Sequence, residues 1–367
     1  MDFAPDDDQQ LIVDTVRRFA DRDLRAWAAD ADRAGAPPDR FAATAGDLGL
    51  FADAIPADAG GLLDDAAAYS HVTRALRGFE LGRGCAALAA LIESNVEPAL
   101  ATARWGSPAA KSALFSALGA GKLAAFAHDS TARLTIESSG GDVAITGKLG
   151  PIPALAGAAF VLIASRDALV LAPTAGATIA ITPITPSGWR AARWATAQLA
   201  QHRVPADFVL SRDPLAIADV LAWARCSLAA RAAGVATAAM EHAAAYAAER
   251  VQFGQPIGRF EALIRLRDDA QTGATAARLM ALHAAWLLDR GASSRAAAHD
   301  AASRARVLAG DVVSRATIDA VQIFGGYGFV NDYPVEKLMR DARAFEALLG
   351  DERLGRVLAQ RAHLEAV

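Results

Sequence analysis

The order in which helical and β-type patterns follow one another constrains the fold of this chain most. From about residue 6 to 118, apolar residues recur three and four positions apart with charged residues between them, which is typical of amphipathic helices. From about 119 to 215, short β-branched runs punctuated by Gly, Pro and Asp replace this pattern. The helical period returns at Asp219 and persists to the C-terminus. The chain is therefore predicted to be helical, then β, then helical.

The central runs predict strands of a small β domain. No long helices lie between them, as a parallel doubly wound sheet would need, so antiparallel pairing is predicted and a Rossmann fold is disfavoured. With 367 residues the chain also exceeds the size of a single hydrophobic core. We predict an α+β, mainly α fold with an N-terminal helical domain at 1–118, a central antiparallel β domain at 119–215 and a C-terminal helical bundle at 216–367. The predicted strands contain residues 143–145, 160–163, 169–171 and 179–181.

Composition excludes several classes of function. The net charge of −4 and the pI near 6.0 indicate neither nucleic acid nor an acidic membrane surface as a partner. An acidic N-terminus and the lack of a long uncharged apolar run predict a cytoplasmic protein without a membrane segment. Cys85 and Cys226 are expected to be small buried residues rather than a disulfide. The seven histidines form no tight ligand cluster, so no metal is predicted.

Two blocks carry a resemblance to a known family. Residues 247–261, Ala-Ala-Glu-Arg-Val-Gln-Phe-Gly-Gln-Pro-Ile-Gly-Arg-Phe-Glu, look like the acyl-CoA dehydrogenase segment in which a long helix ends and turns. Residues 322–329, Gln-Ile-Phe-Gly-Gly-Tyr-Gly-Phe, and the segment 333–343 are similar to the other characteristic block of that family. Weaker matches at 1–19 and 203–210 extend the resemblance over nearly the whole chain.

The resemblance implies a fold, a cofactor and a reaction. It implies an N-terminal helical domain, a central β domain and a C-terminal four-helix bundle, with FAD held between domains and across a subunit interface of a homo- or hetero-oligomer. It further implies α,β-dehydrogenation of an acyl thioester, on CoA or on a carrier protein, with hydride transfer to the flavin and onward transfer to an electron-accepting flavoprotein.

The cofactor residues carry over from the two blocks. Arg250 lies near the end of a predicted helix, where a guanidinium can bridge a pyrophosphate, although a charge complementing the helix dipole is the alternative. Gln252 and Phe253 carry over as cofactor neighbours, with ordinary packing as the alternative for the phenylalanine. Three further cofactor candidates lie in the second block, namely Gln322, Gly325 and Gly326. The glycines have no side chains and so allow the backbone to approach a cofactor closely. A plain turn from helix to loop is the alternative.

The usual catalytic base is missing from both positions where the family carries it. Ungapped alignment places those positions at Leu349 and Ala224, and neither side chain accepts a proton. Glu346 and Asp351 are the candidate substitutes, although surface carboxylates are usually just solvated. Arg225 matches the arginine beside the base and is assigned to substrate binding, with a solvated helix charge as the equal alternative.

The central domain departs from the family as well. The family's Thr-Glu-Pro and Gly-Ser-Asp loop beside the flavin corresponds to a shortened stretch that contains His128 and Asp129. The aromatic-Ile-Thr segment that packs on the flavin corresponds to residues 151–153, Pro-Ile-Pro, which have neither ring nor hydroxyl. Two alternatives to a dehydrogenase therefore stay open. One is a non-catalytic or half-site subunit that gives its dinucleotide contacts to a neighbour carrying the glutamate, and the other is a divergent flavin enzyme such as an oxygen-activating relative.

Overall fold

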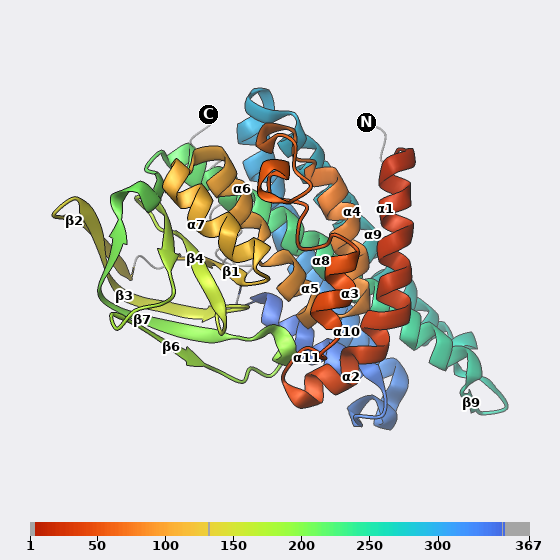
Figure 1. Cartoon of the computed structure of the whole chain (residues 1–367). Coiled ribbons are helices and arrows are strands. Elements are labelled where there is room, and N and C mark those ends of the chain that lie inside the picture. Colours follow the sequence, from red (N-terminus) through yellow and green to blue (C-terminus); the bar gives the residue numbers. More distant parts are fainter. Residues whose placement is uncertain (1–3, 131–132, 347, 349–367) are drawn as a thin grey trace.

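The computed structural model describes residues 4–130, 133–346 and 348, and it has the predicted order of helical, β and helical parts (Figure 1). In the first part, the side chain of Asp6 accepts from the backbone N–H of Gln9, and the side-chain oxygen of Gln9 accepts from the backbone N–H of Asp6. This capping box begins the first helix. The helices of this part are α1 (Asp7–Phe19), α2 (Arg25–Ala34), α3 (Phe41–Asp47), α4 (His71–Gly84), α5 (Ala86–Glu93), α6 (Val96–Trp105) and α7 (Pro108–Gly119).

The central part holds two four-stranded sheets, and each of the four predicted runs lies inside a strand. One sheet has the order β1 (Leu123–His128), β4 (Ala158–Ala164), β5 (Leu169–Pro173) and β8 (Val209–Ser211). The other has the order β2 (Leu134–Ser139), β3 (Asp142–Ile152), β7 (Ala195–Pro205) and β6 (Ile179–Pro183).

The predicted antiparallel β domain is confirmed, with one strand pair as the exception. β1 and β4 run parallel, with Phe126 opposite Leu162, whereas the other strand pairs of the described residues are antiparallel. The long connection from β1 to β4 explains the parallel pairing, because neighbouring parallel strands need a long crossover. Here the chain leaves β1, builds the β2–β3 hairpin in the second sheet, and then returns to the first sheet in its original direction.

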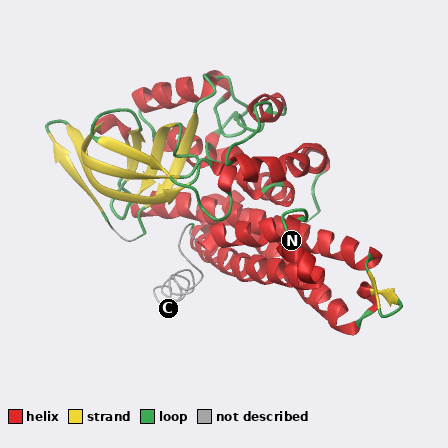
Figure 2. Ribbon diagram, turned by 90° about the horizontal axis from the view of Figure 1, so that it is seen from below, coloured by secondary structure: helices red, strands yellow, loops and turns green. Residues whose placement is uncertain are grey.

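The C-terminal part is built on α8 (Pro214–Glu249), which packs against α9 (Glu261–Asp289), α10 (Arg295–Phe324), α11 (Pro334–Glu346) and also α4. Asp213 caps α8 by accepting from the backbone N–H of Leu215. A short hairpin of β9 (Val251–Gln252) and β10 (Gln255–Pro256) joins α8 to α9 and projects from the end of the bundle remote from the two sheets (Figures 1 and 2).

Small residues allow α4 and α8 to touch along their backbones. A Cβ on Gly82 of α4 would lie 2.3 Å from the carbonyl oxygen of Arg231, and one on Gly234 of α8 would lie 2.1 Å from that of Phe79. Alanine fills most remaining contact positions of α8, α9 and α10 in the main core. The alanine bias of the sequence therefore serves close helix packing, and it brings side chains of α4, α5 and α8 into one buried cluster.

Both cysteines are free and buried, as predicted. Cys226 donates to the carbonyl of Ala281 at 3.3 Å, and burial raises the pKa of its thiol to about 12. Within the described residues no group of His, Cys, Asp and Glu is placed to hold a metal ion. No helix in the same part of the chain has the length and apolar character needed to cross a bilayer.

Candidate functional site

A cavity of about 240 Å³ lies where α5 and α8 face the ends of β1 and β3. Its helical wall includes Ala224, Leu228 and Arg231, which lie four and three positions apart on one face of α8. Its opposite wall is formed by 126–130 of β1 and the following turn and by 148–153 of β3 and the following turn. The cavity thus brings together the empty base position on α8 and both altered segments of the central domain.

His128 is the titratable side chain at the end of β1 that lines this cavity. Its Nδ1 is buried and has no hydrogen-bond partner within the described part of the chain. Burial and the nearby charge of Arg225 lower the pKa of His128 to about 4. The next residue, Asp129, accepts from the backbone N–H groups of Arg133 at 2.9 Å and Leu134 at 3.0 Å. At neutral pH the histidine is therefore uncharged, while the aspartate holds the turn into β2.

The floor of the cavity includes an ion cluster, which lies beside apolar residues such as Ala90 and Leu228. Burial opposes ionisation of Glu93, but the charges of Arg77 and Arg74 outweigh it and hold its pKa far below the usual range. Glu97, which also lines the cavity, pairs with Arg74 at 2.8 Å. Glu93 accepts hydrogen bonds from Arg74 Nε at 2.8 Å, Arg77 Nη2 at 2.5 Å and Ser227 Oγ at 2.9 Å.

Trp189 forms the wall of the cavity next to Arg231, with the guanidinium carbon 5.8 Å from the ring centroid. The tryptophan has a left-handed backbone conformation with φ of 52°, which a bulky residue rarely adopts. The backbone N–H of Trp189 donates to the carboxylate of Asp341 in α11 at 2.8 Å. Its ring packs edge-on against Phe345, with the two ring centroids 4.7 Å apart. Helix α11 therefore fixes this side of the cavity.

Sequence reasoning missed Arg231 and Trp189. The available signal was Arg231 itself, which is the only charged residue between 226 and 240 in an otherwise small and apolar stretch of α8. A lone arginine on a buried helix face needs a partner or a ligand. The partnership with Trp189 and α11 depends on tertiary contacts that no local pattern reveals.

The predicted substrate residue Arg225 is half-buried and is not among the residues that line the cavity. Burial and repulsion from Arg306 lower its pKa to about 10. Glu346 ends α11, where its Oε1 accepts from Arg343 at 2.5 Å and from Ser314 at 3.2 Å, and it does not line the cavity. The predicted positions Leu349 and Asp351 lie outside the described residues.

Arg250 and the turn that holds Gly325 and Gly326 lie together at the end of the bundle. Arg250 follows the last residue of α8, and its guanidinium carbon lies 5.5 Å from the ring centroid of Tyr327. Tyr327 belongs to the 3-10 turn η8 (Gly325–Phe329) that follows α10, so the two sequence blocks form one surface. Gln322, Gly325 and Gly326 are exposed there, and a Cβ added to either glycine would meet nothing within 4 Å.

This surface is open and partly apolar. Gln252 is exposed, and Phe253 at the tip of the hairpin is 93% exposed with φ of 52°. Phe329 is 74% exposed and Val251 54%. Exposed large apolar side chains of this kind suit contact with a ligand or another chain. The surface is named the hairpin surface below and comprises 250–254 with 322–330.

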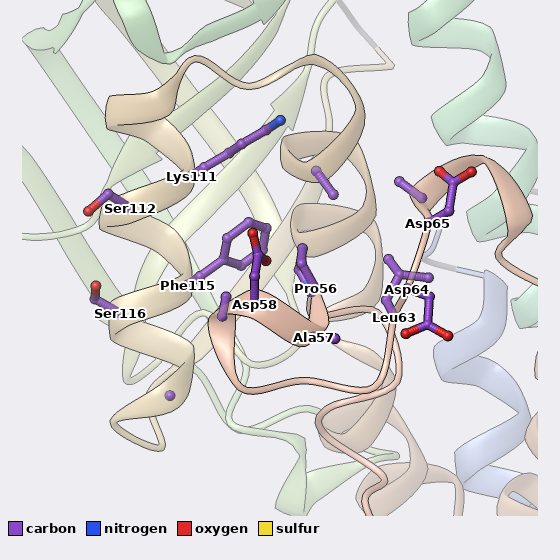
Figure 3. Close-up of a pocket in the computed structure, with 14 residues that line it drawn as sticks. Pro56, Ala57, Asp58, Leu63, Asp64, Asp65, Lys111, Ser112, Phe115 and Ser116 are labelled. Atoms are coloured by element: carbon purple, nitrogen blue, oxygen red, sulfur yellow. The ribbon is translucent and has the colours of Figure 1, made fainter.

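A larger hollow of about 800 Å³ lies between α7 and the loop around residues 56–66 (Figure 3). Its carboxylates, Asp58, Asp64 and Asp65, are exposed to solvent, and none of the predicted site residues lines it. Exposed carboxylates of this kind are ordinarily solvated. The cavity beside Arg231 therefore remains the better candidate site.

Comparison with known proteins places the whole chain in one family. The model of the acyl-CoA dehydrogenase N-terminal domain matches residues 6–122, and that of the C-terminal domain matches 215–363. The chain is 30% identical to the probable acyl-CoA dehydrogenase YngJ of Bacillus subtilis (strain 168), over 98% of this chain and 99% of that protein.

Further relatives cover the chain equally well. It is 28% identical to a cyclohex-1-ene-1-carbonyl-CoA dehydrogenase of Geobacter metallireducens, over 98% of each chain. The structure of butyryl-CoA dehydrogenase from Megasphaera elsdenii matches with a TM-score of 0.87 at 24% identity, covering 99% of this chain and 100% of that one, which supports the fold. The chain therefore belongs to the acyl-CoA dehydrogenase family, whose members are flavoproteins.

Proposed function

We propose that the chain is a subunit of a FAD-dependent dehydrogenase that introduces an α,β double bond into an acyl thioester. The observation that carries this proposal is the contact between Arg250 and Tyr327, which joins both family blocks into one surface suited to a dinucleotide. A guanidinium offers paired donors to a pyrophosphate, and Gly325 and Gly326 leave room for close approach. A bound flavin would accept the β hydrogen as a hydride.

The FAD is proposed to lie between two chains. Ala224 in the cavity and Arg250 on the hairpin surface are connected by continuous helix α8, and the 26 positions between them span about 39 Å at the α-helical rise. This distance exceeds the reach of one flavin dinucleotide. The hairpin surface of one chain must therefore serve the cavity of another chain, and its exposed Phe253 and Phe329 suit such a contact.

The two ends of the proposed site fit the cofactor unequally. The hairpin surface keeps its guanidinium and its open glycines. In the cavity, Pro151 and Pro153 offer no backbone N–H, and Ala224 offers no proton acceptor. If the flavin ring lies in this cavity, another carboxylate has to take the α proton of the substrate. Asp351 and Glu346 stay the candidates, but Glu346 would first have to leave Ser314 and Arg343. Arg225 follows Ala224 on α8 and does not itself line the cavity.

The same asymmetry favours a second candidate function, the half-site subunit. In that arrangement the hairpin surface supplies phosphate contacts to the FAD of a neighbour that carries the catalytic glutamate, and the chain's own cavity does not oxidise substrate. The supporting observation is the position of Ala224, whose side chain lines the cavity where a base would have to act.

Purification at native expression level, followed by flavin absorbance of the assembly that emerges, tests the proposal first. We expect bound or bindable FAD, and its absence both from the chain alone and from its assembly would defeat both candidates. Anaerobic bleaching by a panel of acyl-CoA thioesters then separates them. A homomeric assembly that bleaches supports the dehydrogenase, whereas bleaching only in a mixed assembly supports the half-site subunit.

The role of the substitute carboxylates has its own test. A double variant, Glu346→Ala with Asp351→Ala, should lose turnover in a homomeric enzyme if either residue takes the α proton. Unchanged turnover would exclude both residues as the base.

A further inference from the structure

Arg231 is a buried arginine whose surroundings indicate what kind of ligand the cavity would bind. It is 9% exposed and lines the cavity. The aliphatic part of its side chain packs beside Gly78 of α4, because a Cβ on Gly78 would lie 3.6 Å from Arg231 Cγ. Its Nε is buried without a hydrogen-bond partner in the described part of the chain. The indole Nε1 of Trp189, whose ring centroid lies 5.8 Å from the guanidinium carbon, is also buried without a partner in the described part of the chain.

The neighbouring carboxylates do not satisfy this arginine. Glu93 is already bonded to Arg74, Arg77 and Ser227, and Glu97 is paired with Arg74. Among the described residues, no carboxylate oxygen lies within 4 Å of a guanidinium nitrogen of Arg231, so the arginine forms no ion pair there. Burial lowers the pKa of Arg231 in spite of the charge of Glu93.

Both unpartnered groups are donors only. Arginine and the indole nitrogen have no lone pair to offer, so water or a ligand at this place must bring acceptor atoms. A buried charge without a partner is also unfavourable, because it has lost its hydration. A ligand that carries a negative charge and two acceptor oxygens would satisfy the guanidinium in a paired geometry.

The position of Arg231 determines which part of a thioester meets it. Lys148 and Arg133 line the cavity and are exposed to solvent, so they suit the phosphates of a carrier that stays at the entrance. Arg231 lies on the opposite, helical wall, next to the ion cluster of Glu93. An acyl group that enters from the side of Lys148 therefore presents its far end to Arg231.

The cavity does not suit a long apolar chain. Its volume is about 240 Å³, and its helical wall carries the charged groups of Glu93, Glu97 and Arg231 beside small and aliphatic side chains. Placing a methyl terminus against Arg231 would leave the guanidinium unpaired, whereas a carboxylate terminus would pair with it.

We propose that the cavity binds a short acyl thioester whose acyl group ends in a carboxylate, and that Arg231 binds this carboxylate. The inference rests on the proposed function in one respect, namely that a thioester enters this cavity. It adds the class of substrate and the residue that selects it.

Calorimetric titration of the purified assembly with two thioesters of equal chain length tests the proposal. Glutaryl-CoA carries the terminal carboxylate and pentanoyl-CoA lacks it. We expect glutaryl-CoA to bind at least about tenfold more tightly, since hydrogen bonds to charged groups contribute about 1.5–3 kcal/mol. In Arg231→Gln the ratio should fall to about one, because the charge and the paired donors are lost.

Arg278 of α9 provides a matched control. Its guanidinium carbon lies 4.4 Å from the ring centroid of Phe79 and its Nε is also buried without a partner, but it does not line this cavity. Arg278→Gln should therefore keep the preference of the unmodified protein. If Arg231→Gln does not fold, Arg231→Lys keeps the charge without the planar fork, and we expect it to keep only part of the preference.

The possible results separate the two proposals. Equal binding of both thioesters by the unmodified protein, or an unchanged ratio in Arg231→Gln, would overturn the inference and leave the proposed function intact. A loss of flavin with an unchanged ratio would assign Arg231 to the cofactor and would also overturn it. Failure of every thioester to bind would instead count against the proposed function.

Discussion

The carboxylate of Asp341 accepts a hydrogen bond of 2.8 Å from the backbone N–H of Trp189. Its other oxygen pairs with Lys337 at 2.5 Å, and all three residues are buried. Burial opposes the charge of Lys337, but Asp341 outweighs it and raises the pKa of the lysine. Helix α11, which belongs to the second family block, therefore holds the tryptophan that lines the cavity.

Asp341→Asn should destabilise the protein by about 3–5 kcal/mol, because it leaves a buried lysine without its counter-charge. The amide oxygen still accepts from Trp189, so the loss reports on the ion pair. Urea denaturation followed by circular dichroism gives the change in the free energy of unfolding. Glu261→Gln is the control, since the pair of Glu261 with Arg265 has the same i,i+4 spacing but both side chains are exposed. That change should be within about 0.5 kcal/mol, and equal effects of the two substitutions would contradict the buried role of Asp341.

Strands with β-branched runs were predictable, because such residues pack well on a pleated surface. β1 was not predicted, since its residues Leu-Ala-Ala-Phe-Ala-His are rich in alanine, which favours helix until burial in a sheet overrides it. β7 was also missed, although its buried and exposed residues alternate over much of its length as expected for a half-covered strand. Parallel pairing of β1 with β4 depends on a crossover through the other sheet, which local patterns do not encode.

Some parts of the candidate site could be predicted from the sequence, and others could not. Arg250 and the glycine turn were recognisable as family blocks, and their contact through Tyr327 follows from the two helix ends lying together. The cavity floor was not recognisable, because Arg74, Glu93 and Arg231 come from three different helices. Charged residues on predicted helices are usually solvated, so only their tertiary positions reveal a buried cluster.

His128 should make stability sensitive to mild acid. Its pKa in the folded chain is about 4, below the ordinary value of about 6.5 expected after unfolding. The unfolded chain therefore binds the proton more readily, so stability is fully present above about pH 6.5 and is lost as the pH falls towards 4. The contribution of this residue is at most about 3 kcal/mol.

His128→Gln tests this assignment through urea midpoints measured between pH 7 and pH 4. The variant should lose less stability on acidification than the unmodified protein. Some sensitivity should remain, because burial also lowers the pKa of His71. Parallel pH curves for the two proteins would show that His128 is not the source of the dependence.

Arg250→Gln should weaken FAD binding at least about tenfold, because hydrogen bonds from a charged group to a phosphate are lost. Flavin fluorescence titration of the assembled apoprotein measures this change. Arg259→Gln is the control, since Arg259 is an exposed arginine of the turn that follows the same hairpin. A dissociation constant that Arg250→Gln leaves unchanged would remove the guanidinium from the proposed cofactor surface.

Ala224→Glu should distinguish the two candidate functions. Ala224 is buried and lines the cavity, so the substitution puts a carboxylate where the family can carry its base. If FAD and thioester both enter this cavity, anaerobic flavin bleaching should accelerate about 100-fold to 10,000-fold, the usual range for a positioned general base. Ala224→Gln has a similar shape but cannot take the proton, so it should leave the rate unchanged. A silent Ala224→Glu variant that still binds flavin and thioester would favour the half-site subunit, because the bound flavin would then belong to the neighbouring chain's cavity.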